Sequence, residues 1–347
     1  MTTRHREKVL PWFLALNCAY GAILAALTIL DFAGADRFWF GALNFYLPHV
    51  IWALPGVLLA ILSLRVAWRW VWAPLLCIVW VLGPIMGFCW SMHTQQGPAE
   101  FRIMTWNVKY GGPGKITQAA MALEIDAARP DIVLMQDSTG LLDGPLGSFF
   151  KGWNVQSSGQ YIIASKFPLD SGEVRLIPYF GENHTCFRCR LHLGAKTIIL
   201  YDAHFQSPRN GLNAFREVRR KPRYLPEAID ELEGNVEARL SQAHALGRLI
   251  EQEREPVVVA GDLNSPDISL ACANLRRAGL HDAFAESGKG YGYTYGHLLL
   301  RHKLPWLVPS WVRIDHIMLS AQLTSRACWT GTDALSDHRP VIADITP

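Results

Sequence analysis

Polar side chains suited to phosphate chemistry recur along the chain, each beside a short apolar segment. They are Asn107, Asp137, His204, Asp262, Asn264, Asp315, Asp337 and His338. Carboxylate and amide oxygens are the ligands that Mg²⁺ and Mn²⁺ prefer. Histidine can contact a phosphate and move a proton near neutral pH. These residue types predict a site that can handle a divalent metal ion and a phosphate group.

Each of these residues also has an ordinary structural explanation when it is considered alone. An Asp that follows a strand often closes a turn or caps a helix, and a lone His at a strand end is often a satisfied structural residue. Gly261-Asp262-Leu263-Asn264 is a common turn composition. The order of all these groups between Asn107 and His338 is much harder to obtain by chance, so it favours the functional interpretation.

Short apolar runs bounded by turn residues precede or contain the polar groups and predict buried strands. The runs cover residues 102–106, 132–135, 161–164, 197–201, 257–260, 314–319 and 341–345. Helical patterns predict helices over residues 117–128, 227–253 and 269–278. Because several strands follow one another without a helix between them, we expect packed sheets with helices outside, not a simple doubly wound sheet.

The order of the polar groups resembles the endonuclease/exonuclease/phosphatase superfamily, and the resemblance covers about residues 100–347. Its most specific pieces are Trp106-Asn107, Gly261-Asp262-Leu263-Asn264 and Ser336-Asp337-His338. The segment 163–168 is similar to a structural strand of that family. The resemblance implies an α/β fold, a four-layer α/β sandwich like that of DNase I. The site would lie at the top, between two sheets.

The same resemblance implies roles on the metal side of the site. Asn107 would help to hold the phosphate and the metal ion, and Asp337 would be a second carboxylate near the metal. Asp137 matches the metal-binding Glu of the family, but Asp is one methylene shorter. The implied cofactor is Mg²⁺ or Mn²⁺.

The remaining residues would act on the phosphate and on the attacking water. His204 matches the histidine that contacts the scissile phosphate. Asp262 would orient or deprotonate water, and Asn264 would fix that geometry. Asp315 would orient His338, which would stabilise the transition state or act as acid or base. The sequence leaves the identity of the base open between Asp262 and His338.

The first third of the chain has the composition of a membrane anchor. Residues 9–30, 38–64 and 70–92 contain no Asp, Glu, Lys or Arg, and about 20 apolar residues suffice for a spanning helix. Eight of the 13 tryptophans lie in this third, several near the ends of the runs, as in an interfacial belt. We expect a membrane anchor over residues 1–93 with three transmembrane α-helices, followed by a catalytic domain over residues 94–347.

The short loops indicate the orientation of this anchor. Arg4, Arg6 and Lys8 precede the first apolar run, and Arg65 and Arg69 lie between the second and third. Positive loops stay in the cytoplasm, so three crossings place the catalytic domain on the periplasmic or extracellular side of the inner membrane. Two alternatives remain open: a signal peptide cut after residue 35, and a buried helical bundle in a soluble protein.

Two insertions bear on the substrate. Residues 206–225 follow His204 and carry Arg209 and Arg216 among six basic residues, which would suit an anion clamp or a solvated face. Residues 297–311 are rich in leucine and tryptophan and include Arg301 and Trp306. That segment would either fold onto the core or contact lipid. Arg209, Arg216, Arg301 and Trp306 are the candidate substrate-binding residues.

The plan of three spans and one external domain is also similar to the bacterial teicoplanin-resistance membrane proteins of the VanJ type. That resemblance implies a membrane-lipid substrate, with a polyprenyl pyrophosphate favoured and a phospholipid second, and the bilayer as the partner. An extracytoplasmic nuclease is the alternative enzyme, but the external domain is near neutral, whereas duplex-DNA nucleases have a basic face. A non-catalytic module that binds a lipid or a partner is the third alternative, supported by Asp137.

The external domain has four cysteines, Cys186, Cys189, Cys272 and Cys328. An oxidising compartment would permit disulfides among them. A zinc site with His184 and His192 is less favoured, because in a strand Cys189 would point away from the other candidate ligands. Free or disulfide-bonded structural cysteine is the preferred interpretation.

Overall fold

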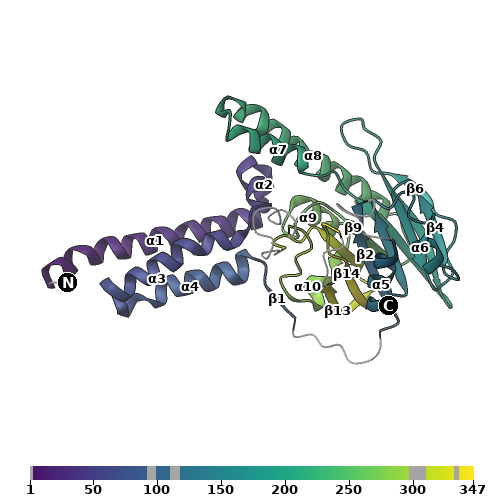
Figure 1. The fold of residues 1–347 in the computed structure, drawn as a ribbon, viewed down its shortest axis with the longest axis horizontal. Coiled ribbons are helices and arrows are strands. Elements are labelled where there is room, and N and C mark those ends of the chain that lie inside the picture. Colours follow the sequence, from purple (N-terminus) through teal and green to yellow (C-terminus); the bar gives the residue numbers. More distant parts are fainter. Residues whose placement is uncertain (1–2, 92–98, 110–117, 297–309, 332–335) are drawn as a thin grey trace. The chain divides into compact units, whose positions relative to one another are not determined.

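The computed structural model describes residues 3–91, 99–109, 118–296, 310–331 and 336–347. The chain divides into two compact units, Met1–Cys89 and Trp90–Pro347. Figure 1 shows the helical first unit and the sheet-containing second unit along the sequence. β1 (Cys89–Trp90) spans the point of division.

The first unit consists of helices. They are α1 (Thr3–Ala33), α2 (Trp39–Phe45), α3 (Leu54–Val66) and α4 (Trp72–Trp80), with the short turns η1 (Ala35–Arg37), η2 (His49–Ala53), η3 (Trp68–Trp70) and the π-helical η4 (Val81–Ile85). Three stretches are long and apolar enough to cross a membrane by length and composition: Leu10–Ala33, His49–Val66 and Trp68–Ile85.

The length of the second apolar run predicted one continuous helix, but the structure shows a break within it. α2 ends at Phe45, and the candidate span begins only at His49, after Pro48. Proline has no backbone N–H and disfavours helical conformation in the residue before it, which explains a break here. The third stretch ends at Ile85, earlier than the expected residue 92, and Gly87 then adopts a positive φ of 69°.

The second unit contains two six-stranded sheets. The first has the order β13 (Thr324–Thr330), β14 (Val341–Thr346), β2 (Phe101–Asn107), β3 (Ile132–Gln136), β5 (Tyr161–Ser165), β4 (Asn154–Ser158). The second has the order β10 (Leu280–Asp282), β12 (Asp315–Ser320), β9 (Val257–Asp262), β8 (Lys196–His204), β7 (Thr185–Leu193), β6 (Glu173–Leu176). A further strand, β11, covers Lys289–Gly290.

Each sheet has one parallel pair near its centre, and the other described pairs in these two sheets are antiparallel. β2 pairs with β3 in parallel, and β8 pairs with β9 in parallel. A parallel pair needs a crossover connection. Helix α5 (Gln118–Ala128) lies in the first crossover, and α7 (Arg209–Val218), η6 (Pro222–Tyr224) and α8 (Leu225–Ile250) form the second.

Helices cover the outer face of each sheet. α5 and α6 (Pro145–Phe149) pack on the first sheet, where Met121 and Leu146 meet Met104 and Trp106. α8 and α9 (Leu270–Arg277) pack on the second. α10 (Ala283–Ser287) contacts β12 and β13. The two sheets contact each other through their central strands, so the predicted four-layer α/β sandwich is confirmed.

Gly261 fixes the end of β9, directly before Asp262. Its φ is 144°, a conformation that side chains rarely adopt, and a Cβ there would lie 1.9 Å from the carbonyl oxygen of Ala203. Ala203 is the residue opposite Gly261 in the parallel β8–β9 pair. The absence of a side chain at position 261 therefore allows β8 and β9 to approach closely beneath the polar residues at their ends.

We expect Gly261→Ala to lower the free energy of unfolding by about 3 kcal/mol or more, because both the clash and the backbone conformation are unfavourable. Thermal unfolding of the solubilised full chain measures this. Gly234→Ala in α8 is the matched control, since a Cβ there meets nothing within 4 Å, and alanine favours the helix by up to about 1 kcal/mol. Equal stability of the two variants would contradict the role given to Gly261.

Candidate active site

One edge of the sandwich collects most of the predicted site residues. Asn107, His204 and Asp262 end β2, β8 and β9, and Asp137 follows β3 directly. Carboxyl ends of parallel strands lie at the same edge of a sheet. Asp315 begins β12, which runs antiparallel to β9, and it lies opposite Asp262 in the register. The fold thus brings both sheets' polar termini to a single site.

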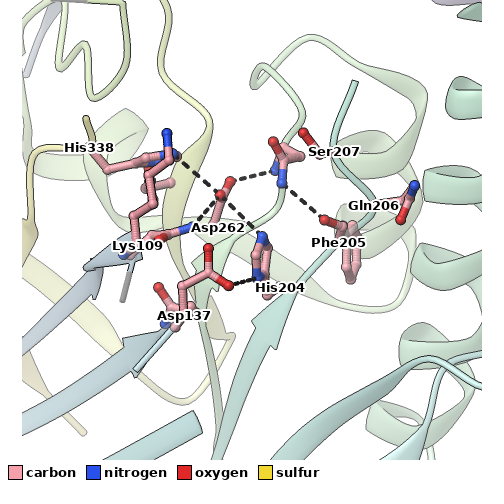
Figure 2. A network of polar contacts seen from close by, with 12 residues as sticks. Lys109, Asp137, His204, Phe205, Gln206, Ser207, Asp262 and His338 are labelled. Carbon is pink, nitrogen blue, oxygen red and sulfur yellow. Dashed lines mark hydrogen bonds and ion pairs between the residues drawn. The ribbon is translucent and has the colours of Figure 1, made fainter. Parts of the chain in front are cut away.

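Asp262 lies at the centre of this site (Figure 2). Its side chain is buried, and Oδ2 accepts a hydrogen bond of 2.9 Å from Asn107 Nδ2. Oδ1 accepts one of 2.9 Å from the backbone N–H of Asn264. His204 Nε2 and His338 Nε2 each lie 3.6 Å from Oδ2. Burial raises the pKa of Asp262, while His338, His204 and the Asn107 hydrogen bond act in the opposite direction.

Asn264 supports Asp262 through its backbone N–H, which donates to the carboxylate. Its φ is 48°, a left-handed conformation that Asn tolerates better than most residues. Its side-chain Nδ2 donates to the carbonyl of Phe205 at 2.9 Å. That bond ties the loop after β9 to the residue after His204, so the ends of β8 and β9 are held together.

His204 is oriented by two acceptors on its other side. Its Nδ1 lies 2.7 Å from Gln160 Oε1 and 3.6 Å from Asp137 Oδ1. Because these oxygens only accept, Nδ1 carries the proton in this arrangement. Nε2 is then directed towards Asp262 and the space between them. Gln160 was absent from the sequence prediction, although Gly159-Gln160 forms the tight turn between β4 and β5.

His338 forms a hydrogen-bonded pair with Asp315, as the family resemblance implied. Nδ1 lies 2.9 Å and 3.1 Å from the two carboxylate oxygens of Asp315. Burial alone would lower the pKa of His338, but the charges of Asp315 and Asp262 outweigh it and raise the pKa to about 10. His338 is therefore a cation at neutral pH, with Nε2 towards Asp262.

The segment Thr294–Tyr295 holds this pair in place and was not among the predicted site residues. Thr294 Oγ1 accepts hydrogen bonds from the backbone N–H groups of Ile314 and Asp315. The Tyr295 ring packs on the His338 ring with centroids 4.9 Å apart. The tyrosine precedes the apolar insertion in sequence, and nothing in its local sequence pattern marks it as part of the site.

The acidic groups of the site differ in their capacity to hold a metal ion. Ligand atoms of Asp262, Asp315 and His338 lie within 4.8 Å of one another, but a protonated His338 that donates to Asp315 offers no lone pair to a metal. Asp137 is different, because its polar neighbour is His204 at 3.6 Å and its side chain is 17% exposed. Asp137 and Asn107 follow or end the neighbouring parallel strands β3 and β2, and their side-chain oxygens are of the kind that Mg²⁺ or Mn²⁺ prefers.

Asp337 is already paired with a cation. Its Oδ2 accepts a hydrogen bond from Lys109 Nζ, and the carboxylate is nearly buried. A second group with metal-ligand spacing, Asp267 with Asp282 and His316, is similarly occupied. There, Asp282 Oδ2 accepts from Arg313 at 2.7 Å and from His316 at 2.8 Å. Protein cations neutralise the carboxylates in both places.

Two of the four predicted substrate-binding residues lie within electrostatic reach of the site. Arg209 and Arg216 are exposed on α7. Burial raises the pKa of Tyr295 to about 12 with the help of Asp337, and the positive charges of Arg209 and Arg216 oppose that shift. Both guanidinium groups therefore act on the ring that packs against His338. Arg301 and Trp306 lie outside the described residues.

The four cysteines of this unit are buried thiols. The two histidines that the sequence offered as zinc ligands beside these cysteines have other partners. His184 Nε2 lies 2.7 Å from the carbonyl oxygen of His204, and His192 Nε2 lies 2.9 Å from Asp170 Oδ1. Among the described residues, neither group with metal-ligand spacing contains Cys186 or Cys189.

His338 makes the stability of the fold depend on pH. A raised pKa means that its contribution is fully present below about pH 6.5, the value in the unfolded chain, and is lost as the pH rises towards about 10. One bound proton corresponds to a loss of up to about 1.4 kcal/mol per pH unit. We expect the unfolding temperature to fall across this window in the unsubstituted chain and to fall less in His338→Gln.

Comparing His338→Gln with the unsubstituted chain removes the contributions of other groups to the pH dependence of stability, because both chains share their tyrosines and cysteines. His244→Gln, at an exposed position of α8, is the control and should retain the original slope. Identical pH dependence in His338→Gln and the unsubstituted chain would show that His338 is not held as a cation.

Solved structures similar to this chain carry the same fold. D. rerio TDP2, complexed with single strand DNA product, is 17% identical with a TM-score of 0.54, and the match covers 71% of this chain and 99% of that chain. A family protein from Bacteroides thetaiotaomicron is 14% identical with a TM-score of 0.53, covering 71% and 97%. One from Bacteroides vulgatus is 17% identical with a TM-score of 0.53, covering 71% and 98%.

Among curated proteins, no sequence matches this chain. The profile of the Endonuclease/Exonuclease/phosphatase family matches residues 104–338, from the middle of β2 to His338. The matched region is more than half of the chain and contains the whole set of polar residues around Asp262. The chain therefore belongs to the Endonuclease/Exonuclease/phosphatase family.

Proposed function

We propose that this protein is a divalent-metal-dependent phosphoesterase of the cell inner membrane, with its catalytic domain on the periplasmic or extracellular side. Its substrate would be a phosphate ester or anhydride of a membrane lipid, a polyprenyl pyrophosphate first and a phospholipid second. The observation that carries this proposal is the combination, in one chain, of a family phosphoesterase site with three stretches able to span a bilayer.

In the proposed reaction Asp262 accepts the proton of the attacking water. Two observations support it over His338. His338 already carries a proton at neutral pH, so it has no free site for another. Burial raises the pKa of Asp262, which makes its carboxylate a stronger proton acceptor than an ordinary aspartate. Asn107 and the backbone of Asn264 fix the carboxylate orientation.

The two fixed imidazole rings, of which His338 is a cation, would stabilise the charge that develops on the phosphate oxygens. His338 is fixed by Asp315, and His204 is fixed by Gln160, so neither ring has to reorient during the reaction. Asp137 and Asn107 would hold the Mg²⁺ or Mn²⁺ ion. When bound, that ion would polarise a phosphate oxygen and lower the charge repulsion felt by the incoming water.

Two features support a lipid phosphate as the substrate. Arg209 and Arg216, near Tyr295, offer bidentate donors to a second phosphate group or a headgroup. The apolar insertion with Arg301 and Trp306 has a composition suited to a lipid surface. The bilayer would be the partner that delivers the substrate, and no protein partner is proposed.

A nuclease is the second candidate, because a similar structure, D. rerio TDP2, is complexed with single strand DNA product. The basic residues of α7 and its continuation could contact a nucleic-acid backbone. A non-catalytic binding module is the third candidate, and it rests on the shorter Asp137 side chain at the metal side of the site.

The deciding experiment compares two substrates with the detergent-solubilised full chain and Mg²⁺ or Mn²⁺. We expect phosphate release from undecaprenyl pyrophosphate without nicking of supercoiled plasmid. Asp262→Asn, which has nearly the same shape, should reduce the rate by about 10²-fold or more. Chelation of the metal should abolish it.

Nicking without phosphate release would reject the lipid substrate and favour the nuclease. Activity on neither substrate nor on a phospholipid, with a folded protein that still binds Mn²⁺, would favour the binding module. An Asp262→Asn variant as active as the unsubstituted chain would reject the proposed base.

A further inference from the structure

Lys109 places an ammonium group inside the candidate site. It follows Asn107 by two residues and adopts a φ of 45°. Its backbone N–H donates to Asn107 Oδ1 at 3.0 Å, so the chain turns sharply at the end of β2. This turn directs the side chain across to the loop before β14, where Nζ donates to Asp337 Oδ2. Figure 2 shows Lys109 beside His338 and Asp262.

The pairing changes what Asp337 can do. Its side chain is 8% exposed, while that of Lys109 is 32% exposed. Lys109 is the cation that the structure pairs with this carboxylate among the described residues. A divalent ion bound to Asp337 would have to displace the ammonium or lie directly against it, and either arrangement is unfavourable for like charges.

Asp137 lies on the other side of Asp262 and has a different environment. No Lys or Arg in the described part of the chain forms an ion pair with it, and its neighbour is His204 at 3.6 Å. The carboxylate is partly exposed, and Asn107 ends the adjacent parallel strand, opposite Gln136, the residue before Asp137. The two carboxylates that the family resemblance grouped as metal ligands therefore occupy different environments.

We propose that Lys109 supplies the positive charge at Asp337, so that the site holds one divalent ion, at Asp137 and Asn107, and the Lys109 ammonium binds the substrate phosphate. This inference rests on the proposed function as a metal-dependent phosphoesterase. Lysine has three N–H donors. One donates to Asp337, and the 32% exposed side chain leaves the ammonium group accessible to phosphate oxygens.

Metal binding without substrate tests the first part of the inference, that the site holds one divalent ion. Mn²⁺ is titrated into the detergent-solubilised full chain, and free Mn²⁺ is followed by electron paramagnetic resonance. We expect one bound ion per chain. Asp137→Asn should weaken binding by about tenfold or more, as loss of a direct ligand does. Asp337→Asn should leave the affinity for Mn²⁺ unchanged. Lys109→Met should expose the Asp337 carboxylate and allow a second, weaker Mn²⁺ to bind.

Binding of inorganic phosphate to the Mn²⁺-loaded chain tests the second part of the inference, that Lys109 binds the substrate phosphate. We expect Lys109→Met to weaken phosphate binding by about tenfold, the effect of losing one charge-assisted hydrogen bond, and Lys109→Arg to retain most of it. Lys151→Met, at an exposed position after α6, is the matched control and should bind phosphate and Mn²⁺ as the unsubstituted chain does. Thermal unfolding of each variant verifies that it is folded.

The outcomes separate the inference from the proposed function. Two bound Mn²⁺ ions in the unsubstituted chain, or equal losses in Asp337→Asn and Asp137→Asn, would overturn the inference and leave the metal-dependent reaction intact. Unchanged phosphate binding in Lys109→Met would overturn the substrate contact. Absence of any bound Mn²⁺ would overturn the proposed function and the inference together.

Discussion

A buried carboxylate, Asp262, imposes the constraint on which the rest of the site depends. Removing a charged carboxylate from water is costly unless donors surround it. Here the donors come from separate parts of the chain, Asn107 from β2 and the backbone of Asn264 after β9, and the ring nitrogens of His204 and His338 each lie 3.6 Å from the carboxylate. Bringing them together requires two sheets that pack face to face with their polar strand ends at one edge, and within the second sheet Gly261 lets β8 and β9 approach closely. The same burial that makes Asp262 expensive to ionise makes it a strong proton acceptor.

Much of this arrangement could be predicted from the sequence, because buried parallel strands leave continuous apolar runs followed by polar residues. β2, β3, β8 and β9 all have this signature, and helices α5, α8 and α9 lie where the periodicity predicted them. Other elements have no such signature. β6 is exposed at every residue and has only two apolar side chains, so it lacks the continuous apolar run of the buried strands. α7 lay within a segment expected only as a basic insertion. The contacts of Gln160, Thr294 and Lys109 arise from tertiary packing between distant segments, and no local pattern encodes them.

The membrane-like part of the chain illustrates a different limit of sequence reasoning. Composition alone identified three apolar runs, but it could not say where helices begin and end within them. Pro48 interrupts the second run, so the helical stretch starts at His49 and the preceding residues form the separate helix α2. Combined with a family site, these stretches are the basis of the proposal that the substrate resides in a bilayer. Arg209 and Arg216 lie on α7, the helix that follows His204, and their charges oppose the rise in the pKa of Tyr295. Both are therefore candidates to bind a phosphate group of such a substrate.

The most direct test of the central claim is the protonation state of His338 in the resting protein. The full chain, labelled with ¹⁵N at histidine and solubilised in detergent, would be titrated by NMR, with His338→Gln identifying the signal. If Asp262 and Asp315 set the charge of the site, both ring nitrogens of His338 carry protons at pH 8 and the ring loses one only near pH 10. A neutral His338 ring at pH 7 would contradict the account, because the site would then lack the fixed cation that the buried carboxylates are arranged to hold.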